Sequence, residues 1–263
     1  MVARHQQRAS GGALDEHELR AQVRATFDSY SRYWLEMFRI PMEVRNGAIG
    51  RHFRVDGFEH VTAGVAAGRG TILALPHLGG WEWAGAWIAG QGHDLLAVVE
   101  PVEPPALFDW FVEQRRAFGL DIVPLGPDVS SRILRALRDN RIVCLLCDRD
   151  LTGDGVQVEF FGETTTLPAG PATLALRTGA ALLPVATYFA PGQDHRAQVL
   201  PAIPTQRDGR LREDVARITQ ALACEFEQLI REAPEQWHLL QPNWPSDRTG
   251  APVPIADPST PCE

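Results

Sequence analysis

Residues 70–83 read GTILALPHLGGWEW, with an apolar run, a histidine and two glycines in direct succession. The run from 70 to 76 is short and apolar, which is typical of a strand that is buried on both faces. The two glycines allow a sharp turn into a helix that begins near Trp81. We therefore expect His77 at the carboxyl end of a strand, where open α/β sheets bind their ligands.

Similar apolar runs follow along the chain and alternate with stretches that are compatible with helices. The runs are 94–100, 121–126, 141–148, 181–189 and 197–201, and the helical stretches are 81–90, 104–118, 128–140, 170–179 and 213–232. This alternation predicts one α/β domain with a central, mostly parallel or mixed sheet flanked by helices. We expect the domain to span 14–245, between a disordered N-terminus (1–13) and a disordered Pro-rich tail (246–263).

The first predicted helix runs from Asp15 to Phe38 and ends because of Pro41. Its apolar residues recur at intervals of three or four; they are Leu19, Val23, Phe27, Tyr30, Trp34 and Phe38. This apolar face has two interpretations. It packs on the domain core, or it inserts partly into a lipid interface, where tryptophan and tyrosine are favoured.

Composition excludes several functions. The chain of 263 residues has a net charge of −8, which disfavours nucleic acid as a partner because phosphate binding requires a basic face. No apolar run reaches the roughly 18 residues of a membrane span. All 25 basic residues are arginine, so a P-loop lysine, a Schiff base and a lysine general base are excluded. Arginine must therefore bind any anion.

Two cysteines with the CxxC spacing, Cys144 and Cys147, lie in the predicted strand RIVCLLCD (141–148). Residues three apart on a strand point to opposite faces, so the two thiols are not expected to bind one metal ion. We expect them to be core residues of a reduced protein, and we expect no metal site and no cofactor. The sequence also lacks the GxSxG of a serine hydrolase and the GxGxxG of a dinucleotide enzyme.

Glu82 follows His77 by five residues, and no other histidine of the chain has an acid at this spacing. On one continuous helix the two side chains would point about 140° apart, but the turn at the glycines allows them to meet. A carboxylate that holds one imidazole nitrogen fixes the tautomer and stabilises the cation, which suits a general base. The alternative is a histidine at a strand end that merely caps the next helix.

A longer segment, 77–126, resembles the bacterial lysophospholipid and lipid A acyltransferase superfamily, whose signature is H-x4-D/E. Within it the likeness is to the actinobacterial phosphatidylinositol mannoside acyltransferases. Supporting blocks are SYSRYWLEMFRIP (29–41), CDRDLTGDGVQVEFFGETTTLPAGPATLALRTGAALLPVATY (147–188) and PEQWHLLQPNW (234–244). The resemblance covers residues from about 20 to 245, with its blocks in the family's order.

The resemblance implies that His77 deprotonates a sugar hydroxyl, which attacks an acyl thioester without an acyl-enzyme, while Glu82 supports the base. It implies that Glu100 and either Arg115 or Arg116 line the acceptor site, where an arginine suits the phosphate of a phosphoinositide. A second carboxylate near the histidine is expected from the third block, whose candidates are Asp148, Arg149 and Glu159, and we favour Glu159 as the catalytic one.

The implied reaction transfers a long acyl chain, palmitoyl, from acyl-CoA to a hydroxyl of a phosphatidylinositol mannoside. The implied location is the cytoplasmic face of the cell membrane, with peripheral attachment. The aromatic residues near the expected site are Trp81, Trp83, Trp87, Phe108, Trp110 and Phe111. We expect most of them in the core and the remainder along a tunnel for the acyl chain.

Two other functions remain open at this stage. One is a lauroyl-type acyltransferase that acts on a lipid A precursor. The other is a non-catalytic, lipid-binding peripheral membrane protein that uses the same apolar pocket. The use of arginine alone is typical of a GC-rich genome, which favours the mannoside acceptor.

Overall fold

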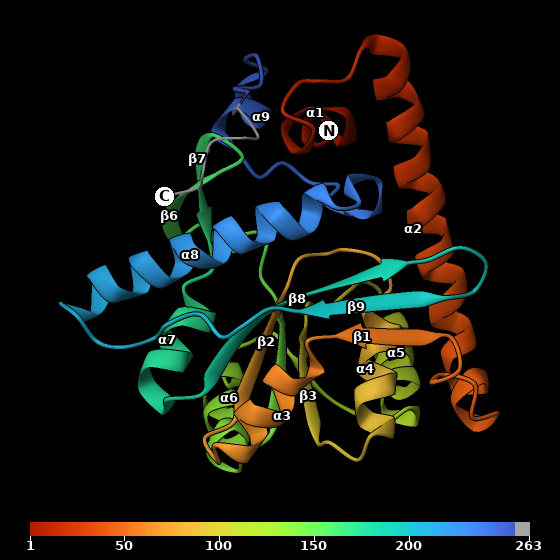
Figure 1. Ribbon diagram of the computed structural model, residues 1–263, viewed down its shortest axis with the longest axis vertical. Coiled ribbons are helices and arrows are strands. Elements are labelled where there is room, and N and C mark those ends of the chain that lie inside the picture. The colour runs from red at the N-terminus through yellow and green to blue at the C-terminus, as the bar shows by residue number, and fades with distance from the viewer. Residues whose placement is uncertain (256–263) are drawn as a thin grey trace.

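The computed structural model describes residues 1–255, which form a central sheet of seven strands (Figure 1). The strands are β1 (Phe53–Asp56), β2 (Thr71–Leu75), β3 (Leu95–Val99), β4 (Leu120–Pro124), β5 (Ile142–Leu146), β8 (Ala181–Phe189) and β9 (His195–Val199). Their order across the sheet is β1-β9-β8-β2-β5-β3-β4. Strands β8, β2, β5, β3 and β4 are parallel, and β9 is antiparallel to β8. This confirms the predicted single α/β domain with a mostly parallel, mixed sheet.

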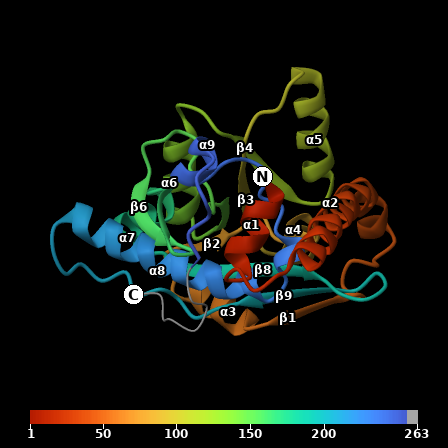
Figure 2. The same cartoon turned by 90° about the horizontal axis from the view of Figure 1, so that it is seen from above.

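Helices cover both faces of the sheet (Figures 1 and 2). They are α1 (Val2–Ala9), α2 (Glu16–Arg45), α3 (Phe58–Ala66), α4 (Trp81–Gly90), α5 (Pro105–Ala117), α6 (Val129–Arg138), α7 (Gly170–Thr178), α8 (Leu211–Arg231), a 3₁₀ turn (Pro234–Gln236) and α9 (Pro245–Thr249). Helices α3, α4 and α5 contribute to the core on one face, and α6, α7 and α8 to the core on the other. A hairpin of β6 (Val156–Phe160) and β7 (Glu163–Leu167) packs on α8.

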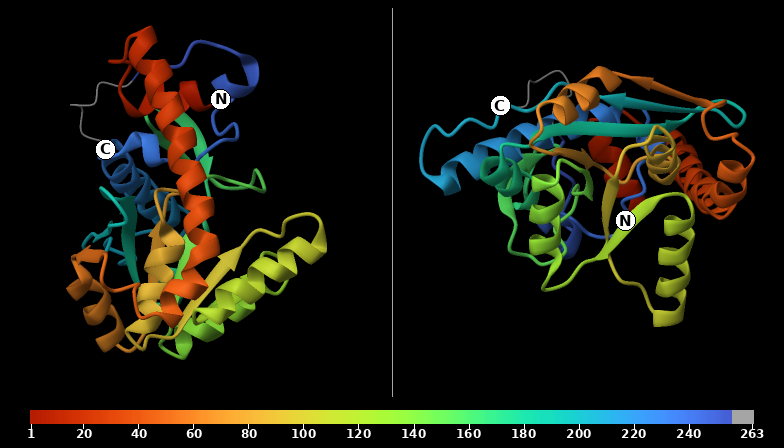
Figure 3. Two further views of the ribbon diagram at one scale, coloured as in Figure 1. Left: turned by 90° about the vertical axis from the view of Figure 1, so that its right-hand side faces the viewer. Right: turned by 90° about the horizontal axis from the view of Figure 1, so that it is seen from below.

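Helix α5 stands away from the body of the molecule beside the long helix α2 (Figure 3). Helix α2 begins where the sequence predicts, because Asp15 and Glu18 form a capping box. Pro41 does not end it, however, and the helix continues to Arg45. A proline removes one helical hydrogen bond, but the neighbouring Ile40 is buried and this packing holds the last turn in place.

The expected disorder of residues 1–13 is wrong for most of this segment, because Val2–Ala9 form helix α1. His5 and Arg8 of this helix are buried polar side chains, and both contact Asp247 of α9. Arg8 also lies over the ring of Trp244 and pairs with Glu163. The polar composition suggested fraying, but these polar groups find buried partners at the far end of the chain.

The expected tail from 246 onward is partly structured. Residues up to Thr249 belong to α9, and 250–255 have no regular structure. The rest of the predicted tail, 256–263, lies outside the described residues. The sequence also gave no sign of β1, β6 and β7, since these strands carry too many polar side chains to form apolar runs.

Candidate active site

His77 stands beyond the carboxyl end of β2, as the sequence predicts. Every residue of β2 is buried, and the chain turns at Gly79 before α4 begins. Gly79 has φ +59°, and a Cβ atom there would lie 2.3 Å from the carbonyl oxygen of Thr187. Only glycine fits this turn. The turn fixes the distance between His77 and the start of α4.

The acidic partner of His77 is Asp148 and not Glu82. The Nδ1 atom of His77 lies 2.5 Å from Oδ1 of Asp148, and the backbone N–H of His77 donates to Oδ2 at 3.0 Å. Asp148 follows β5, which is the neighbour of β2 in the sheet. The carboxyl ends of the two parallel strands therefore bring together residues that are 71 positions apart in the sequence.

Asp148 is fully buried, whereas the side chain of His77 keeps 22% of its surface exposed. Burial alone would raise the pKa of Asp148, but the His77 imidazole and three hydrogen bonds outweigh it and hold the pKa below its ordinary value. Asp148 is therefore an ionised carboxylate that accepts from Nδ1–H and leaves Nε2 of His77 with the basic lone pair.

The segment after α8 supports this pair. The indole N–H of Trp237 donates to Oδ2 of Asp148 at 2.9 Å, and Asn243 donates to its backbone carbonyl at 3.2 Å. The N–H of His238 donates to the carbonyl of His77 at 2.7 Å. The sequence analysis assigned no role to these residues, which lie in the block PEQWHLLQPNW that carries part of the family resemblance.

Glu82 instead belongs to a buried network that joins three helices. The Arg115 guanidinium donates to it through Nε at 3.0 Å and through Nη2 at 2.5 Å, and the Tyr33 hydroxyl donates at 3.1 Å. Burial would lower the pKa of Arg115, but the charge and hydrogen bonds of Glu82 raise it above its ordinary value. Burial and the Glu82 charge raise the pKa of Tyr33. With its oxygens occupied, Glu82 has no contact with the ring nitrogens of His77.

The remaining predicted residues divide into two groups. Glu100 and Arg149 line the same pocket as His77 and pair with each other at 2.5 Å. Arg116 and Glu159 are exposed and do not line that pocket. The backbone of Glu159 on β6 pairs with the side chain of Gln220 on α8. The preference for Glu159 as the second carboxylate is therefore wrong, and Asp148 occupies that role.

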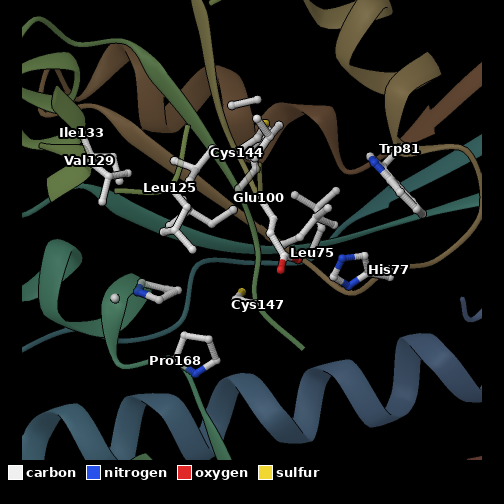
Figure 4. A pocket seen from close by; sticks show the side chains of 18 of the residues that line it. Leu75, His77, Trp81, Glu100, Leu125, Val129, Ile133, Cys144, Cys147 and Pro168 are labelled. Carbon is white, nitrogen blue, oxygen red and sulfur yellow. The ribbon is translucent and has the colours of Figure 1, made fainter. Parts of the chain in front are cut away.

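A pocket of about 620 Å³ extends from His77 into the molecule, and most of its lining is apolar. In Figure 4, His77 and Trp81 lie on one side of it, Val129 and Ile133 on the other, and Glu100 and Cys144 between them. Trp81, Phe108 and Phe111 line it, as expected of part of the aromatic set. Trp83 stacks on His195, and Trp87 packs against Phe53 and Phe58.

The pocket has two arms, one on each face of the sheet. The core arm lies between the sheet and helices α4 and α5; its residues include Leu73, Gly85, Leu95, Leu120 and Cys144. The outer arm lies between the sheet and helices α6 and α7; its residues include Val129, Ser130, Ile133, Thr173, Leu174 and Arg177. Cys144 and Cys147 are free thiols that line opposite arms, in agreement with the prediction that they point to opposite faces of the sheet.

Within residues 1–255 no cluster of histidine, cysteine and acidic side chains has the arrangement of a metal site. The Nε2 atom of His77 has no hydrogen-bond partner there and faces the pocket. An oriented imidazole with a free Nε2 accepts a proton from a hydroxyl or delivers one to a leaving group. A histidine of this kind beside an apolar pocket is the arrangement expected of an enzyme that acts on substrates with a large apolar part.

The chain belongs to the bacterial lipid A biosynthesis acyltransferase family, whose model matches residues 12–246. It is therefore an acyltransferase. It is 43% identical over 228 residues to the phosphatidylinositol mannoside acyltransferase of Mycolicibacterium smegmatis, which covers 86% of this chain and 73% of the relative. The protein of that name from Mycobacterium tuberculosis is 44% identical over 227 residues, covering 85% and 70%.

A more distant relative is the lipid A biosynthesis acyltransferase of Haemophilus influenzae. It is 26% identical over 186 residues, which are 69% of this chain and 55% of the relative. These similarities confirm the family that the sequence motifs indicated.

Proposed function

We propose that this acyltransferase moves a long acyl chain, palmitoyl, from acyl-CoA to a hydroxyl of a phosphatidylinositol mannoside. The observation that carries the proposal is the pairing of His77 with buried Asp148 at the mouth of a 620 Å³ apolar pocket. The similarity to two mycobacterial enzymes named for this acceptor supports the choice of acceptor.

The proposed reaction is a direct attack without an acyl-enzyme. His77 Nε2 takes the proton of the acceptor hydroxyl, and the oxygen forms a bond to the thioester carbonyl carbon. When the carbon–sulfur bond breaks, the protonated imidazole returns the proton to the thiolate of CoA. Asp148 stabilises the imidazolium between these two steps, in the role that was first expected of Glu82.

The acyl chain is assigned to the core arm, which is lined by the buried side chains of Leu73, Leu95 and Ile88. Each methylene buried there contributes about 0.8 kcal/mol to binding. For the acceptor phosphate, Arg149 is the better candidate of the predicted arginines. Arg115 is held in a buried pair with Glu82, and Arg116 does not line the pocket, whereas the partner of Arg149, Glu100, is half exposed.

The test incubates the purified protein with palmitoyl-CoA and a phosphatidylinositol mannoside and follows the acylated product by mass spectrometry. The wild-type protein should form it, and His77→Ala should abolish formation while leaving the circular dichroism spectrum unchanged. Lipid binding without transfer would support the carrier function instead. Transfer only to a lipid A precursor would support the lauroyl-type alternative.

Peripheral attachment to the cytoplasmic face of the cell membrane is a second part of the proposal. No helix within residues 1–255 is long and apolar enough to cross a membrane. One side of α2 nevertheless exposes large apolar side chains, which are Phe27, Leu35, Phe38 and Met42. At about 100° per residue these positions span about 80° of the helix. Exposed Trp110 of α5 contacts Phe38 and extends this surface.

An apolar surface with an aromatic edge suits the lipid interface. We expect Leu35→Glu to lower the fraction of protein that sediments with anionic phospholipid vesicles. Leu211→Glu is the matched control, because Leu211 is also exposed but lies at the start of α8. Equal loss of sedimentation in both variants would contradict the assignment of α2.

A further inference from the structure

The sheet is split at its carboxyl edge between β3 and β5. These strands pair only from Leu95–Ile142 to Ala97–Cys144. Beyond that point each strand keeps its other neighbour: β3 pairs with β4 as far as Val99, and β5 pairs with β2 as far as Leu146. The ends of β3 and β5 therefore diverge, and this divergence opens a passage from one face of the sheet to the other.

The pocket extends through this passage between the ends of β3 and β5. Leu73, Ala97 and Cys144 are in register and share one face of the sheet, which is the face of the core arm. Val98 and Leu145 point to the opposite face and line the outer arm. His77, Glu100 and Arg149 lie at the carboxyl edge where the two arms meet. A long molecule can therefore occupy both arms, with its middle beside His77.

The two arms differ in chemistry. The core arm is lined by aliphatic and aromatic side chains, and its only charged pair, Glu82 with Arg115, is internally neutralised. The outer arm is lined by buried Ile133 and Leu174 and also by two residues with hydroxyl groups, Ser130 and Thr173. Ser130 is exposed, so this arm opens to solvent.

Arg177 lies at the far end of the outer arm. It is exposed, and within residues 1–255 it has neither an ion pair nor a side-chain hydrogen bond. Along α7 it is seven residues from Gly170, which also lines the arm, and this corresponds to about 10 Å at 1.5 Å per residue. A free guanidinium at the open end of a groove suits a phosphate group.

We infer that the acyl donor passes through the split between β3 and β5, with its phosphopantetheine portion in the outer arm and its phosphate at Arg177. The inference rests on the proposed use of an acyl-CoA donor. The thioester carbonyl must lie beside His77, and the acyl chain fills the buried core arm. The other half of the donor ends in a bulky nucleotide, so it must leave through the arm that opens to solvent.

The chemistry of the outer arm matches that half of the donor. A pantetheine chain carries two amides between short aliphatic segments, and the Ser130 and Thr173 hydroxyls pair with amides beside apolar side chains. An alkyl chain of the acceptor lipid would leave these hydroxyls and the Arg177 charge without a partner. The acceptor's sugar, which is fully polar, approaches His77 from the solvent side.

The test compares Arg177→Ala with Arg212→Ala, an exposed arginine on α8 outside the pocket. Two donors are used: palmitoyl-CoA, and palmitoyl-N-acetylcysteamine, a thioester without phosphate or nucleotide. Arg177→Ala should raise KM for palmitoyl-CoA about tenfold, as expected for a lost charge-assisted hydrogen bond, with kcat unchanged. The truncated donor should react equally with all three proteins.

An unchanged KM for palmitoyl-CoA in Arg177→Ala would overturn the inference. A raised KM for the acceptor alone would overturn it too and would assign the outer arm to the acceptor lipid. A binding measurement separates this from the proposed function, because it needs no turnover. In a His77→Ala background, Arg177→Ala should weaken binding of palmitoyl-CoA about tenfold and leave binding of palmitate unchanged. That result would support the donor path even for a protein that does not transfer to the mannoside.

Discussion

Two acidic residues beside the same pocket have different tasks because different donors reach them. Asp148 accepts from the His77 ring, the His77 backbone and the Trp237 indole, so it stays charged and holds the imidazole. Glu82 accepts from Arg115 and Tyr33 and ties α4 to α2 and α5. In the proposed mechanism the first carboxylate orients the base, and the second holds together the helices that form the core arm.

Replacing each acid by its amide should therefore have different effects, on activity for Asp148 and on stability for Glu82. Asp148→Asn is expected to lower kcat by about 10³–10⁴ at a nearly unchanged melting temperature, because an amide no longer stabilises the imidazolium. Glu82→Gln should lower the free energy of unfolding by about 3 kcal/mol, because Arg115 is left buried without its counter-charge. Kinetics and thermal denaturation of both variants check these outcomes.

The double variant Glu82→Gln with Arg115→Met removes both charges and should recover part of the lost stability. A thousandfold loss of kcat in Glu82→Gln at an unchanged melting temperature would instead restore Glu82 as the residue that orients His77.

At this scale the sequence predicted the position of His77 but not its acidic partner. His77 follows a short apolar run and precedes two glycines, and these local features suffice to place it at a strand end. Asp148 is 71 residues away, and only the adjacency of β2 and β5 brings it close. The order of strands in a sheet is not encoded in local periodicity, so the nearest acid in the sequence, Glu82, was chosen instead.

Helix α4 connects the catalytic turn to the acyl pocket. It begins three residues after Leu78, and Gly85 on its inner side lines the core arm. A Cβ atom at Gly85 would lie 3.2 Å from the Leu120 side chain, so alanine fits with a small shift but a larger side chain enters the arm. Under the proposed placement of the acyl chain, residue 85 limits the length of chain that the core arm accepts.

We expect Gly85→Leu to shift the preferred donor from palmitoyl-CoA to a shorter acyl-CoA. Each methylene that no longer fits forfeits about 0.8 kcal/mol, which is about a fourfold loss in kcat/KM for each carbon. Gly85→Ala is the matched control and should keep the preference for palmitoyl. Measuring kcat/KM for donors of 12 to 16 carbons checks this, and an unchanged profile in Gly85→Leu would place the acyl chain elsewhere.

The strands and helices that the sequence predicted are those with strong apolar periodicity, such as β2, β5 and α8. Prediction from the sequence failed for elements in which polar residues are held by tertiary contacts. Arg8 and His5 stabilise α1 only because Asp247 and Trp244 lie against it. None of the six residues of the predicted apolar stripe of α2 is fully buried, and Phe27 and Phe38 are exposed. The buried residues of α2 are instead Thr26, Tyr33, Met37 and Ile40.

The stability of the whole molecule depends on pH because one histidine, His238, is buried. His238 lies among the rings of Tyr30, Tyr33 and Trp81, with Ser29 at 2.9 Å from its Nε2. Burial, with a smaller effect of His77, lowers its pKa to about 3. The unfolded chain therefore binds a proton near pH 6.5 that the folded protein does not bind until about pH 3.

The contribution of neutral His238 to the free energy of unfolding is fully present above pH 6.5 and decreases as the pH falls toward 3. Over that window the free energy of unfolding should fall by up to about 1.4 kcal/mol per pH unit because of His238. His238→Phe keeps a ring in the aromatic cluster and should give a shallower slope. Urea denaturation of both proteins between pH 7 and pH 4 checks the expectation, and equal slopes would contradict it.

The support of Asp148 by Trp237 has a consequence for synthesis. The indole donor is added to the chain 89 residues after the carboxylate that it holds, which takes a ribosome roughly 5–20 s. During that interval the growing polypeptide already contains His77 and Asp148 but lacks the indole donor that holds the Asp148 carboxylate. Assembly of the complete set of contacts around this pair therefore waits until translation of the domain nears its close.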